Sequence, residues 1–305
     1  MVRGRKMDKT KKRKNKIYIG NKAFDVVLII FMLLMCVIFL YPFLNVLSVS
    51  FSSNSMITTG QVTFFPREFN LESYKVLFDA ENILRAYGNT IVIAAATTIL
   101  NLVLNSLVAY VLMVPEFCLK KPLSIIILIT MFFTGGTVPT YLLIQNLGLL
   151  NSWWALILPN AVSAYNIFLY KAFFKGISPE IREAAKIDGA GELTILTRIY
   201  APLSKALYAT FGLFSVVGVW NNYYEALLYI KDADKQPIQM ILRKIVFSFT
   251  TTSMGDAQAM IGHGKLNQLS VQYACIIAAI LPILCIYPFV QKYFAQGMQV
   301  GAVKG

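Results

Sequence analysis

Residues 122–170 read PLSIIILITMFFTGGTVPTYLLIQNLGLLNSWWALILPNAVSAYNIFLY, and these 49 consecutive residues include no Asp, Glu, Lys or Arg. A charge-free stretch of this length is too long for one crossing of a lipid bilayer, which takes about 20 residues, and fits two crossings. Over the 305 residues of the chain only 14% are charged and 57% are hydrophobic, whereas soluble domains average about 25% charged residues. The sequence therefore predicts an integral membrane protein.

Six apolar runs are each long enough to cross a bilayer as a helix, at about 1.5 Å per residue. They are residues 24–47, 90–114, 123–144, 153–174, 206–228 and 271–290. The runs lack the alternation of a β-barrel, and lipid offers no partner for unpaired backbone groups, so the crossings must be helices. We predict an all-α, polytopic membrane protein with six transmembrane helices. It has a basic tail at 1–23, a membrane domain at 24–295 and a short tail at 296–305.

The distribution of Lys and Arg predicts how these helices are oriented. If the N-terminus is cytoplasmic, the cytoplasmic segments hold 20 of the 28 Lys and Arg residues and the outer segments hold 8. Cytoplasmic segments are enriched in these residues, so both termini are predicted to be cytoplasmic. The basic tail then serves as an anchor near anionic lipid headgroups. A nucleic-acid-binding arm is disfavoured because no aromatic residues are interleaved with the basic ones.

The predicted cytoplasmic segment 176–203 carries strong helix signals. Ser178 can cap a helix whose first position is Pro179, and Gly189 suits the left-handed conformation that ends a helix. A face of small and apolar residues is expected from Ile181, Ala184, Ala185 and Asp188. A second short helix should follow, with Leu193, Leu196 and Tyr200 on one face and Pro202 at its end. Such a rigid unit suits docking into a groove of a soluble partner, and a helix lying at the lipid interface explains the same residues equally well.

A family resemblance favours the docking interpretation. The segment resembles the EAA loop of permease subunits of bacterial ABC importers, with Ala201 standing where that motif has Leu. The matching positions are Glu183, Ala184, Ala185, Gly189, Ile199 and Pro202. Residues 181–190, IREAAKIDGA, are similar to the version found in carbohydrate-uptake permeases of the maltose type. Residues 287–305 resemble the LplC-like, lipo-oligosaccharide branch of this family, and the likeness covers about residue 24 to the end of the chain.

The resemblance implies a type I importer permease with a cytoplasmic coupling helix. It implies that this chain pairs with a second, homologous permease subunit, that two ATPase subunits bind ATP and Mg²⁺, and that an extracellular substrate-binding protein delivers a carbohydrate. Alternating access would then be driven through the loop 183–202. The residues implied in coupling to the ATPase are Glu183, Ala184, Ala185, Asp188, Gly189, Ala190, Ile199 and Pro202.

The chain's own chemistry is that of a conduit and not of an enzyme. It has no Gly-x-x-x-x-Gly-Lys-Ser/Thr loop to hold a nucleotide, its four cysteines lack metal-binding spacing, and its sole histidine, His263, lies in the outer segment 229–270. We therefore expect no catalytic residue, metal or cofactor in this chain. Asp25 and Glu225 lie near the ends of the predicted crossings, which disfavours an ion-coupled carrier with ionisable groups at mid-membrane. A stand-alone ion-coupled carrier and a non-transporting scaffold or sensor stay as alternatives.

A candidate substrate path lies at the end of the fifth predicted crossing. Aromatic faces and amide groups recognise the C–H faces and hydroxyls of sugars, and such groups are combined in Trp220, Asn221, Asn222 and Tyr223. An aromatic belt at the membrane interface explains the same residues equally well. The sequence identifies neither the sugar nor the partner subunits, and it leaves the role of residues 229–270 open.

Overall fold

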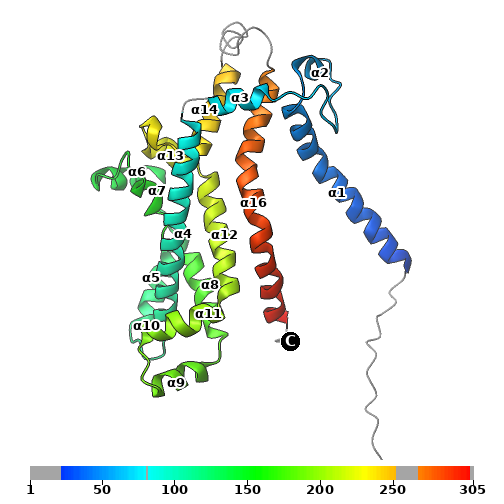
Figure 1. Cartoon of the computed structure of the whole chain (residues 1–305). Helices are drawn as coiled ribbons and strands as arrows, with labels where there is room; N and C mark the ends of the chain where they lie inside the picture. Colours follow the sequence, from blue (N-terminus) through cyan, green and yellow to red (C-terminus); the bar gives the residue numbers. More distant parts are fainter. Residues whose placement is uncertain (1–21, 80–81, 252–266, 303–305) are drawn as a thin grey trace, which may run out of the picture.

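The computed structural model describes residues 22–79, 82–251 and 267–302, and this part of the chain is built from helices, without a strand (Figure 1). The basic tail, up to residue 21, lies outside the described residues, and so does His263. The all-α prediction is thus confirmed for the described residues.

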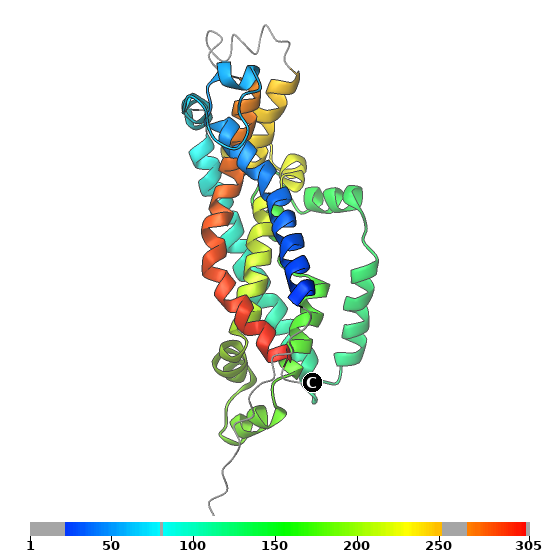
Figure 2. The same cartoon turned by 90° about the vertical axis from the view of Figure 1, so that its right-hand side faces the viewer.

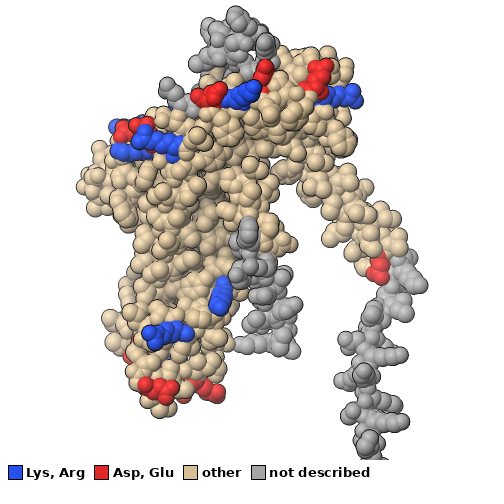
Figure 3. All heavy atoms as spheres, in the orientation of Figure 1, with Lys and Arg blue, Asp and Glu red and all other residues tan. Residues whose placement is uncertain are grey.

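Three long helices form the body of the molecule: α4 (Ile83–Met113), α12 (Lys205–Asn221) and α16 (Gln268–Ala302). α12 packs against both α4 and α16, and α8 (Ala164–Lys175) packs on α4 (Figures 1 and 2). Charged residues gather toward the two ends of the body, and uncharged surface dominates between them (Figure 3). This distribution is the one expected of helices that cross a bilayer.

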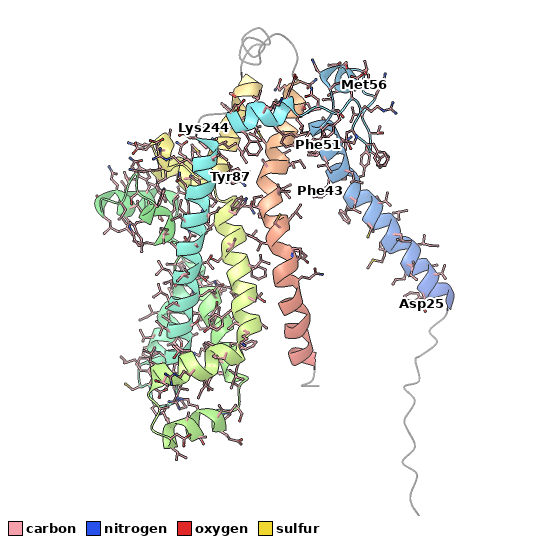
Figure 4. All side chains as sticks on the ribbon, in the orientation of Figure 1. Asp25, Phe43, Phe51, Met56, Tyr87 and Lys244 are labelled. Atoms are coloured by element: carbon pink, nitrogen blue, oxygen red, sulfur yellow. The ribbon has the colours of Figure 1, made fainter. Side chains whose placement is uncertain are left out.

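The first helix, α1 (Lys22–Ser50), meets α16 near one end of the body and then diverges from it (Figure 1). Asp25 lies at the far end of α1, away from the bundle (Figure 4). The most apolar window of this helix is 0% buried. An apolar surface of this size is stable only against lipid or another membrane helix.

The predicted crossings differ in how continuous they are. Three helical stretches are long and apolar enough to cross a membrane: Phe24–Ser50, Ile83–Met113 and Gln268–Pro288. Two bent pairs raise the number to five if each pair counts as one crossing: Lys120–Phe132 with Thr137–Asn146, and Glu192–Leu203 with Lys205–Asn221. A multi-pass membrane architecture is therefore confirmed, and six straight crossings are not.

Three of the predicted runs are interrupted. The run 123–144 divides into α5 (Lys120–Phe132) and α6 (Thr137–Asn146), which meet at 116°. The turn between them includes Gly136, whose φ of 85° is strained for residues with a side chain. Run 153–174 divides into α7 (Trp154–Ile157) and α8, and run 206–228 into α12 and α13 (Tyr224–Tyr229). The apolar composition of these runs concealed the breaks.

Asparagine side chains on α4 satisfy the backbone groups freed by the break between α7 and α8. Asn101 Nδ2 donates to the carbonyl of Asn160 at 3.1 Å, and Asn105 Nδ2 donates to that of Ala161 at 3.4 Å. Asn105 Oδ1 accepts the backbone N–H of Ser163 at 3.0 Å. Irregular backbone at membrane depth is tolerated only where such partners exist. These amides on α4 therefore hold the α7–α8 break in place.

Residues 48–86 and 229–270, two long segments between predicted crossings, are not plain connections. Residues 48–86 include α2 (Asn54–Thr58) and α3 (Glu72–Asp79), and residues 229–270 include the short helix η2 (Ala233–Lys235) and α14 (Ile238–Thr251). α14 packs on α16, and Asn89 Nδ2 of α4 donates to the carbonyls of Asp234 and Gln236 at 2.8 and 3.0 Å. Polar residues in these segments thus belong to the packed body. At the other end of the sequence, α16 continues to Ala302, beyond the predicted start of the tail at 296.

We predict that Asn105→Leu lowers the free energy of unfolding by about 1–3 kcal/mol, because leucine leaves the groups bonded by this fully buried amide without a partner. Equilibrium unfolding in detergent micelles, followed by circular dichroism, measures the loss. Asn221→Leu is the matched control, since Asn221 is exposed at the end of α12, and its effect should stay within about 0.5 kcal/mol. Equal losses in the two variants would contradict the role given to Asn105.

Candidate functional site

The segment 176–203, here called the α9 segment, forms one end of the molecule. Its first helix, α9 (Pro179–Ile187), lies beyond the ends of α8 and α10 (Glu192–Ile195) (Figure 1). Pro179 occupies the first turn, as predicted, because its missing N–H needs no partner there. Ser178 stands at the N-cap position, but its side chain makes no capping hydrogen bond, so the prediction of a Ser178 cap is wrong.

The end of α9 has the geometry that the sequence predicts. Gly189 has a φ of 81°, in the left-handed region that glycine adopts without a Cβ penalty. The N–H of Ala190 donates to the carbonyl of Ala185 at 2.9 Å, and the N–H of Gly189 donates to that of Lys186 at 3.0 Å. These bonds satisfy the last carbonyls of the helix and stop it sharply after Asp188. The α9 segment thus changes direction at a fixed position.

The two faces of α9 differ from the predicted stripe. Arg182 and Ala185 are buried against the body, at 6% and 8% exposure. Ile181 is 40% exposed and Ile187 is 87% exposed, and Ala184 is exposed between them. The prediction that Ala184 and Ala185 share one contact face is therefore wrong. Ile181, Ala184 and Ile187 form an apolar surface that points away from the body, and we call it the outer face of α9.

A network of ion pairs fixes the inner face. Arg182 donates to both carboxylate oxygens of Glu116, at 3.2 and 3.0 Å, and to both of Glu192, at 3.3 and 2.6 Å. Lys186, one turn later, pairs with the same two carboxylates at 3.1 and 3.0 Å. The hydroxyl of Tyr110 donates to Glu192 Oε2 at 2.5 Å. Since Glu116 lies between α4 and α5 and Glu192 begins α10, Arg182 joins three parts of the chain.

The electrostatics of this network favour its charged state. The hydrogen bond from Arg182 is the main cause that lowers the pKa of Glu116 from 4.5 to about 2, and the bond from Lys186 adds to it. A carboxylate with a lowered pKa contributes its stabilisation fully above the unfolded value and loses it as pH falls through the folded value. The contribution of Glu116 is therefore constant above pH 4.5 and is lost toward pH 2. Physiological changes in pH leave the network intact.

The remainder of the α9 segment only partly follows the prediction. After α10 the chain forms a π-helical turn, η1 (Leu196–Tyr200), and a short helix, α11 (Ala201–Leu203). The wider turn buries Leu196 and Tyr200 but leaves Leu193 65% exposed, so these three residues do not share one face. Pro202 lies inside α11, and the chain bends by 84° just after it, between Leu203 and Lys205. Ile199 is half-buried against the apolar cluster around Tyr200.

The candidate path residues at the end of α12 differ in burial. Trp220 is 4% exposed, and its indole N–H donates to the carbonyl of Ala279 on α16 at 2.9 Å. Tyr223 is 42% exposed, and the guanidinium of Arg243 lies 5.3 Å from its ring centre. Asn221 is exposed at the end of the helix. The structure therefore assigns Trp220 to the packing of α12 on α16 and leaves Asn221 and Tyr223 on the surface.

Glu225 is the centre of a separate amide cluster. Its Oε2 accepts from Asn160 Nδ2 at 2.7 Å and from Asn222 Nδ2 at 2.8 Å. The cluster joins the break before α8 to the break after α12. Of these three residues, Glu225 and Asn222 could be singled out from the sequence but Asn160 could not, because no spacing in the sequence indicates that Asn160 lies beside them. Among the described residues no group of three or more His, Cys, Asp and Glu side chains could hold a metal ion.

Comparison with known proteins gives matches over most of the chain. The family model described as "Binding-protein-dependent transport system inner membrane component" matches residues 88–300. Protein LplC of Bacillus subtilis (strain 168) is 39% identical over 287 residues, covering 94% of this chain and 96% of LplC. The polygalacturonan/rhamnogalacturonan transport system permease protein YtcP of the same organism is 36% identical, covering 93% of this chain and 99% of YtcP.

A solved structure is similar to the whole fold. It is a chain in the crystal structure of a bacterial ABC transporter involved in the import of the acidic polysaccharide alginate, and it superposes with a TM-score of 0.83 at 30% identity. The match covers 89% of this chain and 96% of the other. This chain therefore shares its fold with a chain of an ABC transporter.

We predict that Arg182→Met loosens the α9 segment from the body, because it removes the buried bidentate partner of Glu116 and Glu192 and leaves Lys186, a point charge, as the cation of the network that pairs with both. Hydrogen exchange measured by mass spectrometry should show amides of α9 exchanging at least about tenfold faster, with α4 unchanged. Arg198→Met is the matched control, because Arg198 is exposed on η1 and has no ion pair in the described part of the chain. Unchanged exchange in Arg182→Met would show that the network does not hold α9.

Proposed function

The chain belongs to the family of binding-protein-dependent transport system inner membrane components, and we propose that it forms half of the pore of an ATP-driven carbohydrate importer. It is a transport permease and not an enzyme, as its family and its relatives indicate. The observation that carries the more specific proposal is the outer face of α9: an apolar surface on a charged helix that the ion-pair network holds rigidly at the end of the molecule.

An oligosaccharide is the substrate class that the comparisons favour. YtcP is described as a transport permease for polygalacturonan and rhamnogalacturonan, and the similar structure belongs to an importer of alginate. Each of these substrates is a polymer of sugars. The surface residues Asn221 and Tyr223 and the cluster around Glu225 supply amides, a carboxylate and an aromatic ring, which suit sugar hydroxyls and C–H faces. We propose that these groups line part of the path.

The energy for transport comes from a separate ATPase in this proposal. The sequence has no nucleotide-binding loop of the Gly-x-x-x-x-Gly-Lys-Ser/Thr type. The outer face of α9 would dock into the ATPase, with Glu183 and Asp188 beside it and Gly189 setting where the docked helix ends. Movement of the ATPase would then pass through Arg182 to Glu116 and Glu192, and so to α4, α5 and α10. Rigid-body movement of this kind is a known way of switching a packed structure between two states.

The assembly follows from the same proposal. A second, homologous permease subunit completes the pore, two ATPase subunits bind ATP and Mg²⁺, and a substrate-binding protein delivers the carbohydrate from outside. The exposed apolar surface of α1 supports a membrane-embedded neighbour. We further propose six crossings, several of them bent or broken, between a tail at 1–23 and a tail at 296–305, with both tails in the cytoplasm. The excess of Lys and Arg on the α9 side supports this orientation.

Ile187→Asp tests the docking proposal. Ile187 is 87% exposed, so the folded chain tolerates the change, but a buried carboxylate would weaken docking to the ATPase. We expect ATP hydrolysis stimulated by the loaded binding protein to fall at least about tenfold. Docking would lose the free energy gained by burying one isoleucine side chain, and a loss of that size weakens binding by about this factor. The measurement uses proteoliposomes holding the permease pair and the ATPase that co-purify with this chain.

Phe65→Asp is the control, because Phe65 is 80% exposed in the segment between α2 and α3, at the opposite end of the molecule (Figure 1). It should leave hydrolysis at the wild-type level. Full stimulated hydrolysis and transport in Ile187→Asp would rule out the outer face of α9 as the ATPase contact.

A further inference from the structure

A basic pocket lies beside the α9 segment, and neither the family nor the proposed function explains it. It has a volume of about 410 Å³ and opens between the end of α4, the start of α5 and the end of α8. Four lysines line it: Lys120 and Lys121 from α5, and Lys171 and Lys175 from α8. Two elements distant in sequence thus bring four positive charges to one cavity.

No negative charge balances these lysines in the described part of the chain. None of the residues that line the pocket is Asp or Glu, and none of the four lysines belongs to an ion pair there. Lys171 Nζ donates to the hydroxyl of Ser124 at 3.0 Å, and Lys120 Nζ donates to the carbonyl of Pro115 at 2.7 Å. The adjacent carboxylate of Glu116 is already held by Arg182 and Lys186. Like charges gathered in one pocket repel one another, so an anion in the pocket would be favourable.

The surroundings of the pocket indicate which anion it takes. Its lining also includes Leu112 and Ile125, and exposed apolar residues continue along α5 with Ile126 and Ile129, which are 57% and 51% exposed. Figure 2 shows α5 at the side of the molecule, with α9 beyond it at the lower end. A headgroup with a negative charge could therefore sit among the lysines while its acyl chains lie along α5.

We propose that this pocket binds the phosphate-bearing headgroup of an anionic phospholipid in the leaflet on the α9 side. The hydrogen bonds to the neutral acceptors on Ser124 and Pro115 fix Lys171 and Lys120 in place, and Lys121 and Lys175 close around the phosphate. The phosphate then offsets the repulsion between the lysines at the start of α5 and the lysines at the end of α8. Because Lys120 is bonded to the connection that also carries Glu116, the lipid stabilises the connection to which Arg182 anchors α9. This inference is independent of the substrate that the chain transports.

The test compares lipid retention in two charge-matched variants of the full chain. Lys121→Gln/Lys175→Gln removes the two pocket lysines that are exposed and make no side-chain hydrogen bond within the described part of the chain, so folding should be unaffected. Lys75→Gln/Lys231→Gln removes two exposed lysines from the opposite end of the molecule. Each protein is released from nanodiscs of equal parts phosphatidylglycerol and phosphatidylcholine, and native mass spectrometry counts the lipids that stay bound.

The wild type and the Lys75/Lys231 variant should retain phosphatidylglycerol in preference to phosphatidylcholine. In the Lys121/Lys175 variant this preference should fall about 25-fold, because each lysine near a lipid surface contributes a factor of about five and two lysines are removed. Equal retention in all three proteins would overturn the proposal. Inorganic phosphate that displaces the lipid as efficiently as added phosphatidylglycerol does would identify the pocket as a free-anion site instead. Crosslinks from Lys121 or Lys175 to the ATPase would assign it to a protein partner.

Discussion

Arg182 is the only charged side chain that is buried in the described part of the chain, and the position of the α9 segment depends on it. A buried guanidinium is unfavourable unless its donors are paired, and here Glu116 and Glu192 each accept two of its hydrogen bonds. Removing either carboxylate would leave the buried guanidinium with one partner in place of two. The bidentate geometry also fixes direction, which Lys186, as a point charge, could not do alone. A helix held in this way moves together with α4, α5 and α10 or not at all.

A second constraint acts inside the membrane body, where every backbone group needs a partner. The chain breaks between α7 and α8 and again between α12 and α13, and side-chain amides occupy both places. Asn105 and Asn101 fix the first break, and Asn160 and Asn222 meet at Glu225 beside the second. Broken helices near the middle of a membrane are the usual setting for a transport path. The polar residues of the apolar runs thus define where the helices are interrupted.

The sequence predicted those features that local chemistry determines. Pro179 and Gly189 set the ends of α9 correctly, because a missing N–H and a left-handed φ are properties of single residues. Charge-free runs indicated membrane helices but not their breaks, since a run of apolar residues has the same hydrophobicity whether its helix is straight or bent. The outer face of α9 was misassigned because the burial of Arg182 decides which side of the helix faces the body. That burial depends on Glu116, which lies 66 residues away in the sequence. The basic pocket was missed for the same reason, since its lysines come from α5 and α8.

The central claim is that the outer face of α9 receives force from a nucleotide-driven partner. Site-specific photo-crosslinking from position 187 during turnover tests it most directly, because Ile187 is 87% exposed on that face. The account predicts a crosslink to the ATPase subunit whose yield changes between the ATP-bound and nucleotide-free states. A probe that reacts only with lipid, or with the ATPase at a yield that nucleotide does not alter, would contradict the account.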